Sequence, residues 1–204
     1  MALIKNMMKT LIKLFYVLAF VTSSSCSFAH SGHVDSVSFM SGLLHPLTGW
    51  DHFLAILLAS FWSAFALKKI WVGPVLFMSG MGVGAILGLA QYSVEWFELG
   101  IAFSITGLGV LIYVHQKSNP SLALGLIGLF GFFHGYAHAD ALSGASSAMV
   151  SSIAIDLLGL LVATAVLHGV GVLLANKLRQ FNQMAYKGVG ISATLVGLTM
   201  IFVN

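Results

Sequence analysis

The stretch HPLTGWDH, residues 45–52, leads directly into the apolar run FLAILLASFWSAFAL, residues 53–67. With the residues that precede it, this segment is long enough to cross a membrane, whose hydrocarbon core takes roughly 20 helical residues. Two imidazoles and a carboxylate therefore stand where a membrane helix begins. Ionisable groups inside lipid are costly and are usually kept for function, so we expect residues 45–52 to shape both the fold and a site.

The composition places the whole chain in a membrane. Of its 204 residues, 58% are hydrophobic and only 7% are charged, whereas a soluble domain carries roughly 25% charged residues. We therefore predict an all-α integral membrane protein that lies in a lipid bilayer and binds no nucleic acid. The single cysteine, Cys26, falls in the segment that we expect to be removed. The mature chain would then have no thiol for disulfides, metal binding or nucleophilic catalysis.

Residues 1–29 have the pattern of a secretory signal peptide. Three lysines lie between residues 5 and 13, a short apolar core covers 14–21, and small residues precede the expected cleavage point after Ala29. The apolar core is too short for a first membrane helix. The serines before Cys26 are a poor match to a lipoprotein cleavage site. We therefore predict a cleaved leader.

Residues 30–204 are expected to form a single transmembrane domain, whose start carries two further candidate ligands, His30 and His33. We predict six spans, at about 38–67, 70–91, 96–115, 121–138, 152–175 and 188–203. The first is too long for one straight helix. Because Pro46 lacks a backbone donor and Gly49 weakens a helix, we expect a break or a re-entrant bend near Pro46. The second span contains small residues that suit close helix contact in lipid, namely Gly80, Gly82, Gly84 and Gly88.

The basic residues predict the orientation. A cleaved leader places the mature N-terminus outside, so the loops after spans one, three and five face the cytoplasm. All six Lys and Arg residues of the mature chain lie in or beside these loops: Lys68, Lys69, Lys117, Lys177, Arg179 and Lys187. The two signals agree under the positive-inside rule. We expect a multi-pass protein of a bacterial-type inner membrane, with both mature termini on the outer side.

This topology sorts the ionisable residues by depth. One group lies near the outer face: His45, Asp51, His52, Glu98, His134, His138 and Asp156. His168 is about sixteen residues into the fifth span, or roughly 24 Å along a helix at 1.5 Å per residue. The arrangement suggests an outer site followed by a deeper onward step.

The spacing of these residues suits a cation. His134 and His138 are four residues apart and so share one face of a helix. Asp51 and His52 are neighbours, so either one of them is a ligand and the other its supporting partner, or the helix is distorted there. Imidazole with carboxylate suits nickel, cobalt, zinc or iron and disfavours calcium and magnesium. The residues alone do not order the first four metals.

Three members of the set have equally plain structural explanations. A lone histidine in a membrane helix, such as His168, can serve as a hydrogen-bond donor between helices. Glu98 and Asp156 can serve as anchors at the ends of spans. For these three residues a place on the metal pathway and a structural role both stay open.

The same residues resemble a known family. The H-x5-DH pattern of His45, Asp51 and His52, the FHGYAH segment at 133–138 and the LVATAVLHG run at 161–169 are similar to motifs of the HupE/UreJ membrane proteins. The resemblance implies a permease for nickel, sometimes cobalt, with a functional link to hydrogenase or urease. It implies a transported ion in place of a permanently bound cofactor, and it makes five residues the motif ligands: His45, Asp51, His52, His134 and His138. The sequence leaves open whether the protein forms a homo-oligomer.

One position departs from the family pattern. After the second motif the family usually continues with glycine, any residue and glutamate, whereas this chain has Ala139, Asp140 and Ala141. A shift of one residue rotates the carboxylate by roughly 100° on a helix. Either Asp140 swings back to replace the glutamate, which we expect, or this protein lacks that ligand.

Two other functions are compatible with these ligands. One is an intramembrane zinc metalloenzyme, in which the histidines hold a zinc ion that activates water. The other is a metal-sensing accessory protein. The chain shows no compelling soluble domain or lid to bind a substrate, although a lipid substrate would need neither, and we expect a permease and no enzyme.

Overall fold

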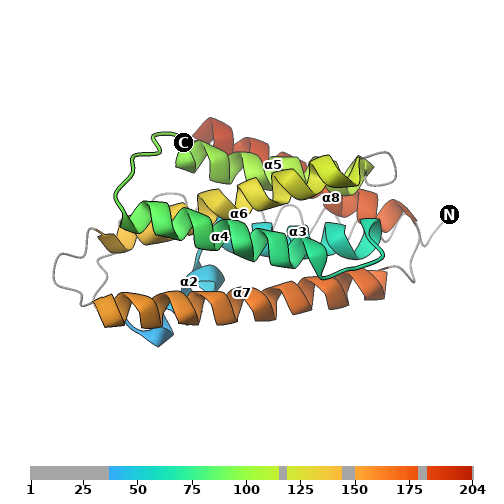
Figure 1. Ribbon diagram of the computed structural model, residues 1–204. Helices are drawn as coiled ribbons and strands as arrows, with labels where there is room; N and C mark the ends of the chain where they lie inside the picture. The colour runs from blue at the N-terminus through green and yellow to red at the C-terminus, as the bar shows by residue number, and fades with distance from the viewer. Residues whose placement is uncertain (1–36, 115–118, 144–149, 179–182, 204) are drawn as a thin grey trace.

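The computed structural model describes residues 37–114, 119–143, 150–178 and 183–203, of which 183–185 and 203 are described by backbone alone. The predicted leader, His30 and His33 lie outside the described residues. The described part of the chain is helical throughout and contains no strand (Figure 1). Its helices are α2 (Phe39–Thr48), α3 (Trp50–Ala66), α4 (Val72–Leu89), α5 (Phe97–Val114), α6 (Pro120–Ser143), α7 (Val150–Leu178) and α8 (Gln183–Val203). The all-α prediction is confirmed.

Four of these helices, α4 to α7, are long and apolar enough to cross a membrane. Two further apolar helices are shorter, namely α3 and the segment Tyr186–Phe202 of α8. The expectation of six spans is therefore met for four helices by length and composition. The first expected span is divided between α2 and α3, neither of which reaches the required length alone.

The chain breaks between α2 and α3 at Gly49, within the stretch 45–49 where a break was expected. Pro46 lies inside α2, where it is buried. Gly49 has φ −85° and ψ 103°, an extended conformation that ends one helix and begins the next. The Gly49 N–H still donates to the His45 carbonyl at 3.0 Å, and the Phe53 N–H donates to the Gly49 carbonyl at 2.9 Å. The break is thus one residue wide, and α2 leaves the axis of α3 (Figure 1).

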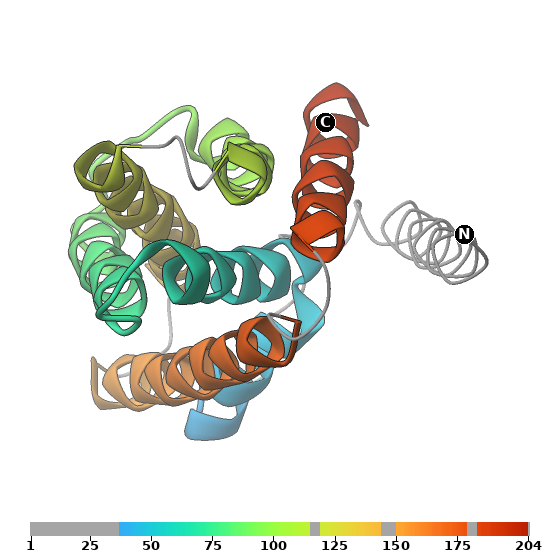
Figure 2. The same ribbon diagram turned by 90° about the vertical axis from the view of Figure 1, so that its right-hand side faces the viewer.

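The core of the bundle is built around α3. This helix contacts α7 on one side and α5 on the other (Figure 2), and it also touches α4 and α6. Its side chains Ala55, Ala59 and Trp62 are fully buried. The remaining helices pack mainly in pairs, with α4 on α6, α5 on α8 and α2 on α7. The histidine-bearing start of α3 is therefore enclosed by neighbouring helices.

Small residues set the close approach of α4 to α6. A methyl group on Gly84 would overlap the carbonyl oxygen of Phe132, and one on Gly135 would overlap the carbonyl oxygen of Met81. Gly82, which the sequence placed with the others, has nothing near its missing side chain and takes no part. Close backbone contact of this kind is how membrane helices associate without a hydrophobic driving force between them. It fixes α6, and with it His134 and His138, against the bundle.

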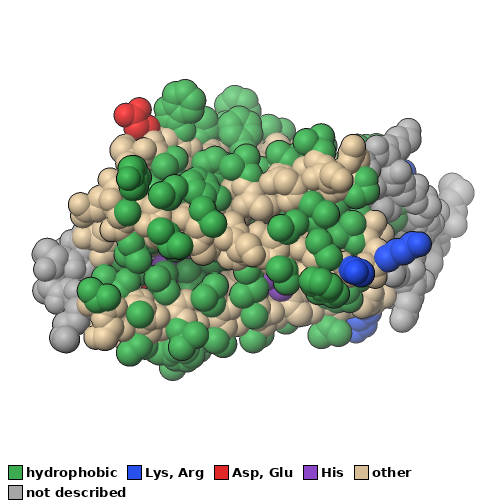
Figure 3. Space-filling view, viewed as in Figure 1, with side chains coloured by type: hydrophobic (Ala, Val, Ile, Leu, Met, Phe, Trp, Pro, Cys, Tyr) green, Lys and Arg blue, Asp and Glu red, His purple; other side chains and the backbone are tan. Residues whose placement is uncertain are grey.

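The two ends of the bundle differ in charge. The described lysines lie at one end, in the turn after α3, at the end of α7 and early in α8: Lys68, Lys69, Lys177 and Lys187. Acidic residues outside the core lie at the opposite end, in and after the turn before α5 and near the end of α6: Glu95, Glu98 and Asp140. Figure 3 shows blue and red side chains at opposite ends of the molecule. The long helices therefore alternate in direction.

Candidate metal-binding site

The break at Gly49 brings the two ends of the first motif together. His45 lies in the last turn of α2, and His52 lies in the first turn of α3. Their ring centroids are 5.0 Å apart, with the planes nearly perpendicular. In an unbroken helix these residues would be seven positions, or about 10 Å, apart along the axis. The extended residue thus converts a sequence motif into a contact between two imidazoles.

The second motif meets the first on α6. His138 lies with its ring centroid 4.3 Å from that of His45, and His134 lies 4.4 Å from that of His52. The four rings form a continuous row in the order His138, His45, His52, His134. His52, His134 and His138 are each 5% exposed or less, and little histidine surface is visible among the hydrophobic side chains of the face in Figure 3. The two motifs that the sequence singled out therefore form one buried cluster.

Asp51 supports His52 from the neighbouring position. Its Oδ1 lies 3.1 Å from His52 Nδ1 and also accepts the backbone N–H of His52 at 2.8 Å. This geometry is possible because the first turn of a helix leaves backbone N–H groups without a helical partner. If Nδ1 carries the proton that Asp51 accepts, the lone pair of His52 is on Nε2. That nitrogen is 3.4 Å from the His134 carbonyl, too far for a strong hydrogen bond.

His138 has a carboxylate partner on another helix. Its Nε2 lies 2.7 Å from Oδ2 of Asp156 on α7, and Asp156 is only 1% exposed. The second oxygen of Asp156 accepts the Ser41 hydroxyl of α2 at 2.6 Å. Three helices are thus joined through one carboxylate. A proton on Nε2 leaves the lone pair of His138 on Nδ1, which is the nitrogen available to a metal.

His134 is oriented by a serine. Its Nε2 lies 3.0 Å from the hydroxyl of Ser104 on α5, and that hydroxyl donates to the Ile101 carbonyl at 2.6 Å. If the serine proton stays on that bond, the serine oxygen accepts from Nε2–H and the lone pair of His134 is on Nδ1. This Nδ1 is buried and has no hydrogen-bond partner. An unpaired acceptor in a buried site is unfavourable by about 1–3 kcal/mol, a cost that a bound cation would remove.

The other candidates lie apart from this row. Asp140 is half-buried near the end of α6, and the salt bridges to histidine in the described residues involve Asp51 and Asp156 and not Asp140. Glu98 is exposed in the first turn of α5. His168 is 3% exposed on α7 and contacts Phe77, which in turn contacts His134. The carboxylate paired with His138 therefore comes from Asp156 of α7, and the expected role of Asp140 as a ligand stays a prediction.

The rings do not converge on a point as they stand. Within the described residues, no three His, Cys, Asp or Glu side chains are arranged to hold one metal ion. The imidazoles pack edge to face, so coordination requires them to rotate about their side-chain torsions. Two supporting hydroxyls were not found from the sequence. Ser41 is four residues before His45 on α2, and this spacing could have indicated that the two side chains share a helix face. Ser104 lies in an apolar helix, and no sequence pattern distinguishes it.

The chain is similar to one family of known proteins and to a named member of it. The family described as HupE / UreJ protein matches residues 18–200. Protein HupE of Rhizobium leguminosarum bv. viciae is 31% identical over 192 residues, which cover 93% of this chain and 97% of that protein. No solved structure matches the chain. The motifs around His45 and His134 lie within the matched region, and the chain belongs to the HupE/UreJ family.

Proposed function

We propose that this protein is a membrane permease that takes up a divalent transition metal cation, nickel first and cobalt second. The observation that carries the proposal is the row of four imidazoles, three buried and His45 half-buried, flanked by two carboxylates, Asp51 and Asp156. Nitrogen and oxygen donors of this kind suit nickel and cobalt. The ion is cargo in this proposal, and no resident cofactor is needed.

The charge of the site suits a dication. Asp51 and Asp156 are 7% and 1% exposed, and the described lysines lie in or beside the loops at the other end of the bundle. Buried carboxylates need a compensating positive charge. Two carboxylates beside neutral histidines match the charge of one divalent ion. When no metal is bound, protons on the imidazole rings can supply the compensating positive charge. We propose that metal and protons compete for this cluster.

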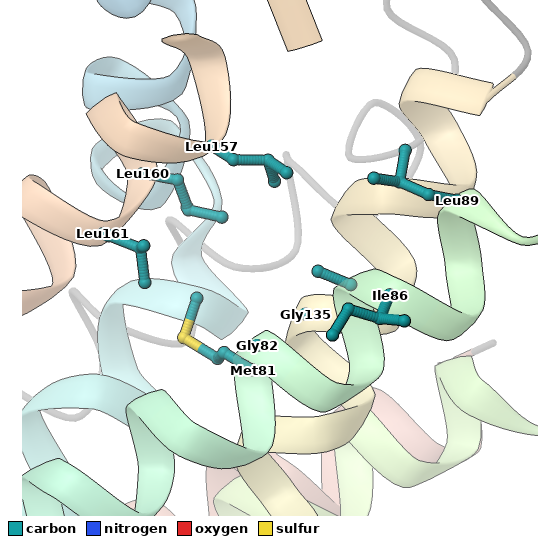
Figure 4. Close-up of a pocket in the computed structure, with 9 residues that line it drawn as sticks. Met81, Gly82, Ile86, Leu89, Gly135, Leu157, Leu160 and Leu161 are labelled. Atoms are coloured by element: carbon teal, nitrogen blue, oxygen red, sulfur yellow. The ribbon is translucent and has the colours of Figure 1, made fainter. Parts of the chain in front are cut away.

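The apolar surroundings indicate where the ion enters. A cavity of about 140 Å³ lies between α4, α6 and α7, and every residue lining it is apolar, among them Met81, Gly135 and Leu160. Figure 4 shows Leu157, Leu160 and Met81 in the space between α4 and α7. A hydrated cation gains no ligand there, so this side offers no route. We propose entry from the end of the bundle that carries Asp140.

The apolar helices and the distribution of charged residues support a topology in the membrane. We propose six spans in a bacterial-type inner membrane, with α2 and α3 together as the first and α8 as the last. We also propose a cleaved leader and mature termini on the outer side. The separation of lysines from acidic residues supports this orientation. Reporter fusions at residues 117 and 147 should report opposite sides of the membrane, and the same side for both would contradict the topology.

Transport explains the site better than catalysis does. A zinc enzyme needs an open coordination position beside a substrate, whereas the apolar cavity carries no polar group to orient one. A permease needs only ligands that follow one another along a path across the membrane. The nickel delivered would serve metalloenzymes of the hydrogenase or urease type.

Uptake of radioactive nickel tests the proposal. Cells that express the chain should accumulate nickel in a saturable manner above cells that lack it. Excess cobalt should compete strongly, whereas excess magnesium should not, because magnesium prefers an all-oxygen shell. Equal accumulation with and without the chain, or equal competition by magnesium and cobalt, would overturn the proposal.

A further inference from the structure

His168 is a buried histidine outside the row, and its ring packs edge-on against Phe77. It is 3% exposed, and neither ring nitrogen makes a hydrogen bond. Its polar neighbour is the backbone of Ile56 on α3, but the Ile56 carbonyl already accepts the Ser60 hydroxyl at 2.9 Å. A histidine kept only to join two helices would be expected to have a free acceptor to donate to. The Ile56 carbonyl is thus at most a shared and poorly aligned acceptor for His168, and neither ring nitrogen is committed to a hydrogen bond of good geometry.

A second unpaired polar group lies one turn away. Thr164 is fully buried on α7, and its hydroxyl has no hydrogen-bond partner. Hydroxyls of threonine in helices usually bond to the carbonyl one turn back, as Thr194 does to Gly190 at 2.9 Å. Residues 164 and 168 are four apart and share a face of α7. Two buried polar groups without a protein partner on one face can contact the same ligand.

The position of His168 is intermediate in depth. It follows Asp156 by twelve residues on α7, which is about 18 Å at 1.5 Å per residue. It precedes Lys177, in the last turn of α7, by nine residues, or about 14 Å. His168 thus lies between the histidine row and the basic end of the bundle.

Phe77 of α4 contacts both places. It is fully buried, and its ring centroid lies 5.7 Å from that of His134 and 5.4 Å from that of His168. Both of these histidines carry an unpaired ring nitrogen. A single aromatic side chain therefore contacts both the inner end of the row and His168.

We propose that His168 and Thr164 form a second, inner cation site, which receives the metal from His134 when the Phe77 ring moves. This inference rests on the proposed uptake function. The inner site offers one imidazole and one hydroxyl, so it holds the ion less tightly than the row of four histidines. Weak binding beyond a strong site suits transport, because conduction requires that each site release the ion. The remaining ligands of the ion here are water molecules.

Uptake kinetics and binding together test the inner site. Initial rates of radioactive nickel uptake are measured in cells that express His168→Ala, His168→Gln or Thr164→Val. Equilibrium binding of nickel is measured on the same proteins purified in detergent. We expect His168→Ala to lower the maximal rate by roughly tenfold or more with little change in KM. Nickel binding to the purified protein should stay at the wild-type level, because the histidine row is intact.

Thr199→Val is the matched control for Thr164→Val. Thr199 uses its hydroxyl within its own helix, at 2.7 Å from the Val196 carbonyl, so the variant should transport nickel as the wild type does. If the His168→Ala protein does not accumulate in the membrane, Thr164→Val and His168→Gln are used in its place. Each should lower the maximal uptake rate and leave nickel binding unchanged. A maximal rate within about twofold of wild type, or loss of nickel binding along with transport, would overturn the inner site.

Replacing the imidazole of His168 by a thiolate tests metal selectivity, which would not change if His168 had only a structural role. His168→Cys should shift uptake from nickel toward cadmium, because a thiolate favours softer metals. Val166→Cys, at a position on α7 that is 61% exposed, should not. A wild-type protein that neither binds nor transports nickel would refute the proposed function itself. A normal wild type with cadmium selectivity unchanged in His168→Cys would refute the inner site alone.

Discussion

His138 of α6 and Asp156 of α7 form a buried pair, with Nε2 of the imidazole 2.7 Å from Oδ2 of the carboxylate. The other carboxylate oxygen accepts the hydroxyl of Ser41 on α2. One aspartate thus sets the orientation of a motif histidine and ties together three helices. In the sequence Asp156 is a candidate with two open explanations. The structure places it in contact with the site and gives it an anchoring bond as well.

Asp156→Asn should strongly reduce nickel uptake. The amide removes a negative charge from a site that has to accept a dication, and it weakens control of the His138 tautomer. Loss of such a supporting partner typically costs about 10- to 100-fold in metal affinity or activity. Uptake at low nickel concentration is the measurement. Glu98→Gln, which changes an exposed carboxylate at the same end of the bundle, is the control and should leave uptake near the wild-type level.

His134→Ala and His138→Ala should each abolish most uptake without loss of protein from the membrane. Both residues belong to one row of rings, so removing either one breaks the same site. Effects of residues that act as a unit are strongly non-additive, and the double variant should be little worse than either single variant. Uptake rates and membrane protein levels are measured together. Losses that multiply in the double variant would assign the two histidines to separate steps.

Asp140→Asn should be nearly silent. Asp140 is half-buried, and in the described structure the carboxylate beside His138 belongs to Asp156. The expectation that Asp140 replaces the family glutamate stays a prediction, and the buried pair of His138 with Asp156 favours Asp156 as the carboxylate of the site. Uptake by Asp140→Asn is compared directly with uptake by Asp156→Asn. An equal loss in both variants would restore Asp140 as a ligand.

Gly84→Ala should destabilise the protein, whereas Gly82→Ala should not. The added methyl group at residue 84 would overlap the Phe132 carbonyl oxygen, while residue 82 has open space around it. Overpacking a close contact usually costs about 1–3 kcal/mol. Thermal unfolding of the two variants in the same detergent measures the difference. Equal stability would mean that α4 and α6 approach less closely than the structure shows.

The sequence by itself determined the class of protein and most of the residues of the candidate site. Scarcity of charge and long apolar runs specify membrane helices, because hydrocarbon excludes unpaired polar groups. The break between α2 and α3 also follows from local chemistry, since Gly49 weakens the helix where residues 45–49 were expected to bend. The glycines of α4 indicated a close helix contact, although spacing alone did not separate Gly82 from its partners.

Only the tertiary structure decided how those residues meet. Helical periodicity is a local property, and it shows that His134 and His138 share a face without showing what lies opposite. The contact of His138 with Asp156 depends on how α7 is rotated and shifted against α6. The contact of Phe77 with both His134 and His168 depends on how deeply α4 lies. Rotation and depth are fixed by packing between distant segments, chiefly at glycines where backbones touch, and no single stretch of sequence contains that information.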